Sequence, residues 1–138
     1  MKKLRNITQQ SFEKYGYVLE HNSEKEGEFQ VVLNEHDPVG WRMAASRITA
    51  KTTSKLAKHP NTMESFVPVC GVSAICVAAG ENPENYEVFL LDKGVCLYKN
   101  TWHSLLALSE VSMVTICENL TVEADEYLFS HEISVCVL

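Results

Sequence analysis

The chain has 138 residues, of which 46% are hydrophobic and 22% charged, and its formal net charge is −6 with the histidines neutral. This length and composition predict one globular domain, residues 1–138, with a single core. The acidic balance argues against a nucleic-acid partner, because nucleic-acid binding needs clustered Lys and Arg. No apolar run approaches the roughly 18 residues that span a membrane, so we expect no membrane partner either.

The five cysteines are odd in number, and each lies in or beside an apolar segment. None forms a Cys-x-x-Cys pair, so the spacing does not favour a zinc knot or a disulfide framework. A free cysteine in an apolar segment behaves as a small hydrophobe. The pattern therefore predicts buried, reduced thiols and a cytoplasmic protein. These residues are Cys70, Cys76, Cys96, Cys117 and Cys136.

A short helix is predicted near the N-terminus. Thr8 can cap it, residues 9–15 form about two turns, and Gly16 ends it. The chain then becomes strand-like at residues 17–20 and again at residues 29–33, before a turn that contains Asp-Pro and Gly.

Most of the remaining chain also reads as strands. Residues 51–61 are polar and β-branched, which indicates a loop or an exposed strand, and residues 121–129 fit a helix or a strand equally well. In residues 41–49, Trp41, Met43 and Ala45 share one side of the alternation. Nine or ten short strands with a turn every 8–12 residues indicate an all-β antiparallel sandwich or barrel. The further strand-like segments are 64–69, 72–79, 86–91, 95–98, 103–108, 111–117 and 133–138.

His59 and Glu64 form the first candidate site. Pro60 biases His59 toward an extended backbone, and Glu64 follows at the start of the apolar strand 64–69. An imidazole beside a carboxylate is a common start of a divalent-metal site or of an acid–base pair. The alternative is a surface histidine near a solvated glutamate.

His103 and Arg47 are the other two residues of interest. His103 begins an apolar strand, where it is either a site residue or a histidine bonded to a backbone carbonyl. Arg47 interrupts an apolar alternation, so its guanidinium either reaches solvent or faces a polar cavity. In a cavity its planar donor fork would suit a substrate carboxylate.

The order of these features resembles the ureidoglycolate lyase family. The resemblance runs from "ITQQSFEKYGYVLE" through "KHPNTMESFVPV" to "DKGVCLYKNTWHSLLAL", nearly the whole chain. Its central motif, H-P-x-x-x-Q-x-F-x-P, matches at His59 and the residues that follow, with Glu64 in the place of Gln. The late motif matches at Trp102 and His103, while Ser104 replaces a second histidine.

The resemblance implies a small antiparallel cupin-like β-barrel of the jelly-roll type with a short N-terminal helix, commonly a homodimer. In cupins a His-x-His-x(3,4)-Glu motif and a later histidine bind a divalent metal, and here Ala57 stands at the first of these histidines. The implied metal ligands are therefore His59, Glu64 and His103.

The implied reaction converts (S)-ureidoglycolate, a small molecule, to glyoxylate and urea. His103 and Glu64 are then the catalytic candidates, and Arg47, Trp102 and Lys99 the substrate-binding ones. A His103 that binds a metal cannot also act as the base, and this sequence leaves both roles open. The alternative function is a non-catalytic cupin-like module that binds a small carboxylate.

Overall fold

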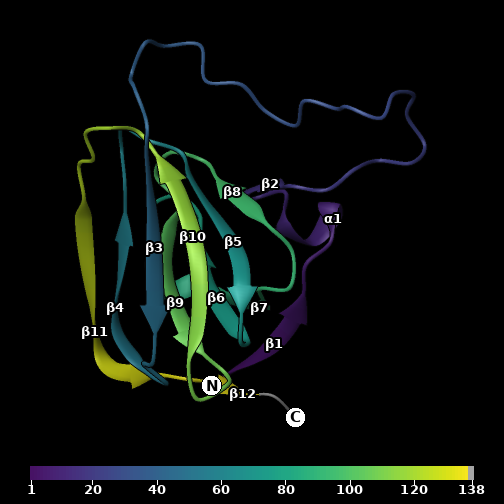
Figure 1. Ribbon diagram of the computed structural model, residues 1–138. Coiled ribbons are helices and arrows are strands. Elements are labelled where there is room, and N and C mark those ends of the chain that lie inside the picture. The colour runs from purple at the N-terminus through teal and green to yellow at the C-terminus, as the bar shows by residue number, and fades with distance from the viewer. Residues whose placement is uncertain (137–138) are drawn as a thin grey trace.

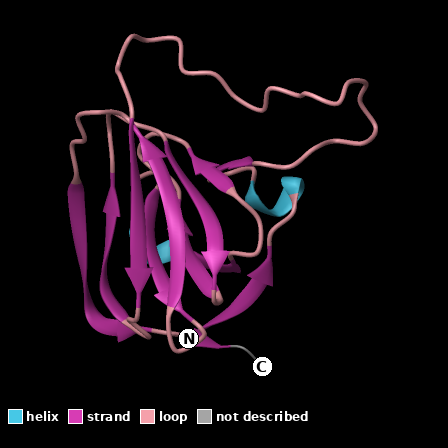
Figure 2. Ribbon diagram, in the orientation of Figure 1, coloured by secondary structure: helices cyan, strands magenta, loops and turns pink. Residues whose placement is uncertain are grey.

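The computed structural model describes residues 1–136, so the last two residues of the predicted strand 133–138 lie outside it. Two β-sheets face each other and form a barrel (Figures 1 and 2). The seven-stranded sheet has the order β11-β4-β9-β6-β7-β1-β12, and the five-stranded sheet the order β2-β8-β5-β10-β3. The strands are β1 Lys2–Asn6, β2 Gly16–Val18, β3 Arg42–Ile48, β4 Thr53–Lys58, β5 Glu64–Cys70, β6 Ser73–Ala78, β7 Glu87–Leu90, β8 Val95–Leu97, β9 Trp102–Ala107, β10 Ser112–Glu118, β11 Asp125–Ile133 and β12 Val135–Cys136.

The predicted N-terminal helix is present but short. Helix α1 covers Gln9–Phe12, and its first turn is closed by a reciprocal pair of hydrogen bonds between Thr8 and Ser11. Phe12 is fully buried between the sheets, which anchors a helix too short to be stable by itself. Gly16 begins β2, where a side chain on its Cα would collide with the carbonyl oxygen of Cys96. A 3-10 turn, η1 Pro83–Asn85, lies between β6 and β7.

Two apolar cores result from the alternation of side chains across the strands. The first fills the barrel between the sheets, and Phe12, Phe66, Ile75 and Phe89 are among its members. The second lies on the other face of the seven-stranded sheet and includes Leu56, Cys76, Ala78, Trp102, Leu106 and Phe129. Neighbouring residues of β9 therefore point into different cores, which decides what each of them can contact.

The all-β, cupin-like prediction is confirmed, with several local corrections. Most strand pairs are antiparallel, but β1 runs parallel to both β7 and β12, and its basic residues gave no strand pattern. The second half of residues 121–129 belongs to strand β11. Residues 51–61 contain strand β4, which pairs with β11 on one side and with β9 on the other. The strand predicted at 29–33 is wrong, because this segment pairs with no strand in the described chain.

The thiols give a direct test of this packing. All five cysteines are free, as predicted, but only Cys76 and Cys96 are buried, because Cys117 and Cys136 are partly exposed and Cys70 is exposed. Burial raises the pKa values of Cys76 and Cys96 to about 12. We expect iodoacetamide to label Cys70 in the native protein and to spare Cys76 and Cys96 until denaturant is added, because the thiolate is the reactive form. Peptide mass spectrometry measures this, and rapid native labelling of Cys76 would contradict the packing.

No helix among the described residues has the length and apolar character needed to cross a membrane.

Candidate functional site

Three of the predicted residues converge at one end of the barrel. Glu64 Oε1 lies 3.1 Å from Nε2 of His59 and 3.0 Å from Nε2 of His103. The three ligand atoms all lie within 4.8 Å of one another, and the side chains are 14%, 9% and 10% exposed for His59, Glu64 and His103 respectively. Residues from three segments meet here: the loop after β4, the start of β5 and the start of β9. We call this group the His–Glu centre.

Backbone carbonyls fix the tautomer of both imidazoles. Nδ1 of His59 lies 2.9 Å from the carbonyl oxygen of Glu123, and Nδ1 of His103 lies 3.0 Å from that of Thr101. A carbonyl oxygen only accepts hydrogen bonds, so each Nδ1 carries the proton. In the neutral rings both Nε2 atoms then direct lone pairs toward the Glu64 carboxylate.

Glu64 is ionised at this position. Burial works against ionisation, but the imidazoles of His103 and His59, when they carry a proton on Nε2, donate hydrogen bonds to the carboxylate, outweigh burial and lower the Glu64 pKa to about 2. The Glu64 carboxylate in turn raises the pKa of His59 against the opposing effect of burial. With both Nε2 atoms unprotonated, Oε1 is buried without a hydrogen-bond partner, although it lies within 3.1 Å of both nitrogens. A buried, unpaired carboxylate oxygen is costly, so this centre calls for a positive charge.

The donor set fits a divalent metal ion. Imidazole nitrogen and carboxylate oxygen are ligands that zinc, iron, manganese and nickel accept. Two ligands at a right angle around an ion lie about 3.0 Å apart when each metal–ligand bond is about 2.1 Å. The 3.0 and 3.1 Å spacings of Glu64 Oε1 agree with such an arrangement. The Nδ1–H bonds to carbonyl oxygens are also the outer contacts that metal-binding histidines usually make.

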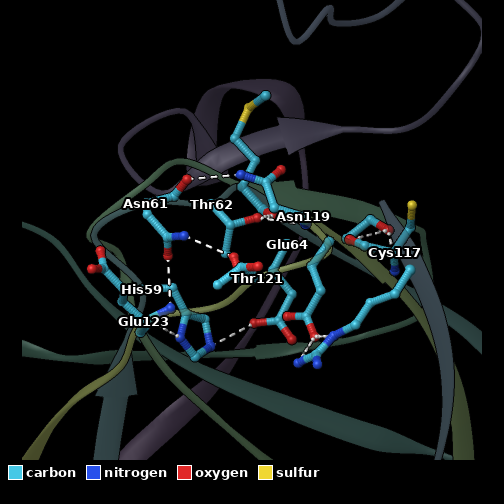
Figure 3. A network of polar contacts seen from close by, with 12 residues as sticks. His59, Asn61, Thr62, Glu64, Cys117, Asn119, Thr121 and Glu123 are labelled. Atoms are coloured by element: carbon cyan, nitrogen blue, oxygen red, sulfur yellow. Dashed lines mark hydrogen bonds and ion pairs between the residues drawn. The ribbon is translucent and has the colours of Figure 1, made fainter. Parts of the chain in front are cut away.

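A polar network holds the loop that carries His59 (Figure 3). Asn61 donates to the carbonyl of Thr121 and accepts from the backbone N–H of Glu123, both at 2.8 Å. Asn119 donates through its side chain to the carbonyl of Asn61 and through its backbone N–H to the hydroxyl of Thr62, again at 2.8 Å. Each bond joins residues 61–62 to residues 119–123. The loop that supplies His59 is therefore tied to the loop that follows β10.

Arg42 and Glu118 belong to the same end of the barrel, and the sequence analysis missed both. Glu118 pairs in register with Glu64 on one side and with Arg42 on the other, so the three side chains share the inner face. Arg42 contacts Glu118 Oε2 through Nε at 2.9 Å and Nη2 at 2.8 Å. Glu118 is 8% exposed and Arg42 50%, so the guanidinium lies at the mouth. The sequence did contain a pattern for both residues. Glu118 lies two and four positions after Ile116 and Val114 on the inner face of β10, and Arg42 lies two and four positions before Ala44 and Ser46 on the inner face of β3.

The structure does not bring Arg47 to the centre. Trp41, Met43 and Ala45 share one side of the alternation, as expected, but that side is the outer face of the five-stranded sheet, and Arg47 lies on it. The inner face of β3 belongs to Ile48, Ser46, Ala44 and Arg42. The prediction that Arg47 faces a cavity is therefore wrong. The buried residues of β10 pair with Ile48 and Ser46 of β3, so Arg47, which lies between them, points to the opposite face.

Neither Trp102 nor Lys99 belongs to the group of converging side chains. Trp102 is 7% exposed, packs in the second core and donates from Nε1 to the carbonyl of Gly80 at 3.1 Å. It is one residue from His103 and points to the other face of β9, so it is not the rim of the centre. Lys99 Nζ lies 3.1 Å from Glu35, and this contact lowers the pKa of Glu35.

Comparison with known proteins identifies the family. The model of the family described as ureidoglycolate lyase matches residues 1–136. The chain belongs to the ureidoglycolate lyase family. This membership confirms the predicted resemblance. No curated protein sequence gives a significant match.

One solved structure supports the fold. A dTDP sugar isomerase from Desulfovibrio desulfuricans G20 is 11% identical with a TM-score of 0.53, over 84% of this chain and 82% of that one. A mutant of Bacillus subtilis oxalate decarboxylase is 13% identical with a TM-score of 0.48, over 64% of this chain. The match spans 24% of the decarboxylase chain, about a quarter of its length. At these identities the likeness concerns the cupin fold alone.

Proposed function

We propose that this protein cleaves (S)-ureidoglycolate to glyoxylate and urea at the His–Glu centre. The single observation that carries the proposal is the convergence of His59, Glu64 and His103 on one buried carboxylate oxygen in a member of the ureidoglycolate lyase family. In this reaction the carbinol O–H bond and the C–N bond break, and the O–H electron pair forms the carbonyl of glyoxylate. The ureido nitrogen leaves with the C–N electrons and takes a proton.

Glu64 is the proposed proton carrier. The reaction consumes no net proton, because the hydroxyl group releases one proton and the departing ureido nitrogen takes one up. Only Oε1 of Glu64 contacts the imidazoles, so Oε2 is free to take the hydroxyl proton and return it to the departing nitrogen. With a pKa of about 2, the carboxylate is ionised at neutral pH but is a weak base. The substrate hydroxyl must therefore be acidified by nearby positive charge.

His59, His103 and Oε1 of Glu64 are the proposed ligands of a divalent cation. When bound, such an ion would supply the positive charge that orients the hydroxy acid and acidifies its hydroxyl. The carbonyls of Glu123 and Thr101 keep each Nδ1 protonated, and so keep both Nε2 atoms available as ligands. His103 then serves as a ligand and Glu64 Oε2 as the base, which separates the two roles.

Arg42 is the proposed partner of the substrate carboxylate, in place of Arg47. It is half-exposed at the mouth, and its Nη1 donors are not used by Glu118. We expect Arg42→Ala to raise KM for ureidoglycolate about 10- to 100-fold with a smaller change in kcat, since a charged hydrogen bond contributes about 1.5–3 kcal/mol. Arg47→Ala is the matched control on the outer face. Equal effects of the two changes on KM would contradict the assignment.

The activity test is an assay of glyoxylate release from racemic ureidoglycolate, with and without added manganese or zinc. We expect turnover of one enantiomer above the spontaneous rate, and loss of it after treatment with a chelator. Binding of a small carboxylate without turnover, under all metal conditions, would favour the non-catalytic module instead. Thermal stabilisation by the ligand would reveal such binding.

The homodimer and the cytoplasmic location are also proposals. Five free cysteines, two of them deeply buried, suit a reducing compartment. A fluorescent fusion tests the location, and a mass measurement in solution tests the assembly.

A further inference from the structure

Three charged side chains form a row across the inner face of the five-stranded sheet, at the end of the barrel that carries the His–Glu centre. Glu118 of β10 pairs in register with Glu64 of β5 on one side and with Arg42 of β3 on the other. The three strands are neighbours in the sheet (Figure 1). Side chains directly opposite each other on adjacent strands have Cβ atoms about 4.5–5.5 Å apart. A molecule bound at Glu64 therefore lies within reach of Glu118 as well as of Arg42.

Glu118 offers one unused hydrogen-bond acceptor in this row. Nε and Nη2 of Arg42 both contact Oε2 of Glu118, so the guanidinium is held on one oxygen of the carboxylate. No group in the described part of the chain donates a hydrogen bond to the other oxygen, Oε1. The Glu118 side chain is largely withdrawn from solvent, and a carboxylate oxygen in such a place is stabilised by a ligand that donates to it.

The charges along the row favour one kind of ligand. Arg42 is its one basic member, so a ligand carboxylate binds there, as in the proposed function. A second carboxylate beside Glu118 would meet a like charge, and opposed like charges are a common means of rejecting a wrong ligand. A neutral group with N–H donors meets the unused oxygen of Glu118 instead. The row therefore suits a ligand with one carboxylate and one group that carries N–H donors.

We propose that Glu118 is a specificity-determining residue, whose Oε1 accepts hydrogen bonds from the ureido N–H groups of the substrate. The inference rests on the proposed function, in which the substrate carboxylate binds Arg42 and the hydroxyl group lies at the His–Glu centre. It defines the substrate class as monocarboxylic acids whose leaving group carries N–H donors, and it disfavours dicarboxylic acids of the same size. Glu118 takes up no proton in this role, so proton transfer stays with Glu64.

Three unreactive acids of equal size test this preference by isothermal calorimetry, at one fixed manganese concentration. N-Carbamoylglycine is ureidoglycolate without its hydroxyl group, and both of its nitrogens carry N–H donors. Succinamate keeps the terminal amide but has CH₂ in place of the inner N–H, and succinate has a second carboxylate in place of the amide. We expect the wild-type protein to bind them in that order, with N-carbamoylglycine at least about 100-fold tighter than succinate, because a hydrogen bond to a charged group contributes a factor of about 10 to 100.

The variant Glu118→Gln removes the charge and keeps an oxygen that accepts from Arg42. We expect the affinity ratio of N-carbamoylglycine to succinate to fall at least about tenfold, because the first ligand loses a charged acceptor and the second loses a repelling charge. Glu110→Gln is the matched control, since Glu110 is exposed and lies just before β10, at the opposite end of this strand from Glu118. Its ratio should equal that of the wild type. The thermal midpoint of each variant shows that it is folded.

The wild-type measurement alone can overturn the proposal, so it does not depend on the folding of a variant. Succinate binding as tight as that of N-carbamoylglycine, or no binding of any of the three acids at millimolar concentration, would reject the role of Glu118. An unchanged ratio in folded Glu118→Gln would reject it as well. Because none of the acids reacts, the result is separate from the glyoxylate assay. The expected order without turnover of ureidoglycolate would reject the proposed reaction and support Glu118 as the N–H acceptor.

Discussion

Glu64→Gln is expected to reduce kcat/KM for ureidoglycolate by about 10²- to 10⁴-fold, the usual contribution of a positioned proton-transfer group. Glutamine has the shape of glutamate, but its neutral amide neither accepts the hydroxyl proton nor neutralises the charge of a divalent ion. Its amide N–H groups can donate to the lone pairs that His59 and His103 direct at this position. The variant should therefore fold, and the loss should belong to the chemistry.

A matched control separates this effect from a general loss of histidines or charge. His36 is exposed, lies in the segment between β2 and β3 and is not one of the three converging residues, so His36→Ala should retain wild-type kcat/KM. His103→Ala should match Glu64→Gln in activity and in loss of metal binding measured by calorimetry. Full activity of Glu64→Gln in a folded protein would show that the centre does not carry the reaction.

The site was largely predictable because its residues sit where backbone constraints are strong. Pro60 sets His59 in extended backbone, and Glu64 and His103 begin strands whose apolar residues fix the register. The face of β3 was not predictable in the same way. Its alternation was correct, but a strand with apolar residues on both sides does not reveal which side is inner, and Arg47 was assigned to the cavity for that reason.

The exposed segment between β2 and β3 and the second core explain the other differences. Residues 29–33 have the composition of a strand, yet they pair with no strand in the described part of the chain. Local propensity does not predict whether a segment finds a partner strand. Trp102 precedes His103 directly, but strand geometry sends adjacent side chains to opposite faces. The second core that receives Trp102 includes Phe129 and Ile133 of β11, which joins the edge of the sheet beside β4, a long-range pairing with no local pattern.

Ser104 has a smaller consequence than the sequence suggests. Ser104 stands where the family motif has a second histidine, which suggests that the His–Glu centre lacks one histidine ligand. Ser104 pairs in register with Cys76, whose side chain belongs to the second core, whereas His103 pairs with Val77 of the barrel core. Position 104 therefore faces away from Glu64, and a histidine there would not reach the centre. The missing ligand is to be sought on the inner face.

Ala57 is that position, and Ala57→His is expected to raise the affinity for a divalent ion. Ala57 pairs with His103 in register across β4 and β9, so their side chains are neighbours on one face. Ala57 is also half-buried, which leaves room for an imidazole. We expect manganese or zinc to bind at least about 10- to 100-fold more tightly, the range by which even outer contacts change affinity. Isothermal calorimetry measures this.

Lys58→His is the matched control, because Lys58 is the next residue on β4 and its Nζ lies over the Trp102 ring on the opposite face, 4.7 Å from the centroid. It should leave metal affinity unchanged. A fourth protein ligand would also occupy a coordination position that the hydroxy acid needs, so Ala57→His should bind metal more tightly and turn over more slowly. Unchanged affinity in a folded Ala57→His would remove position 57 from the centre. Tighter binding with undiminished turnover would instead show that the substrate does not use that position, and that alanine there is not required for the reaction.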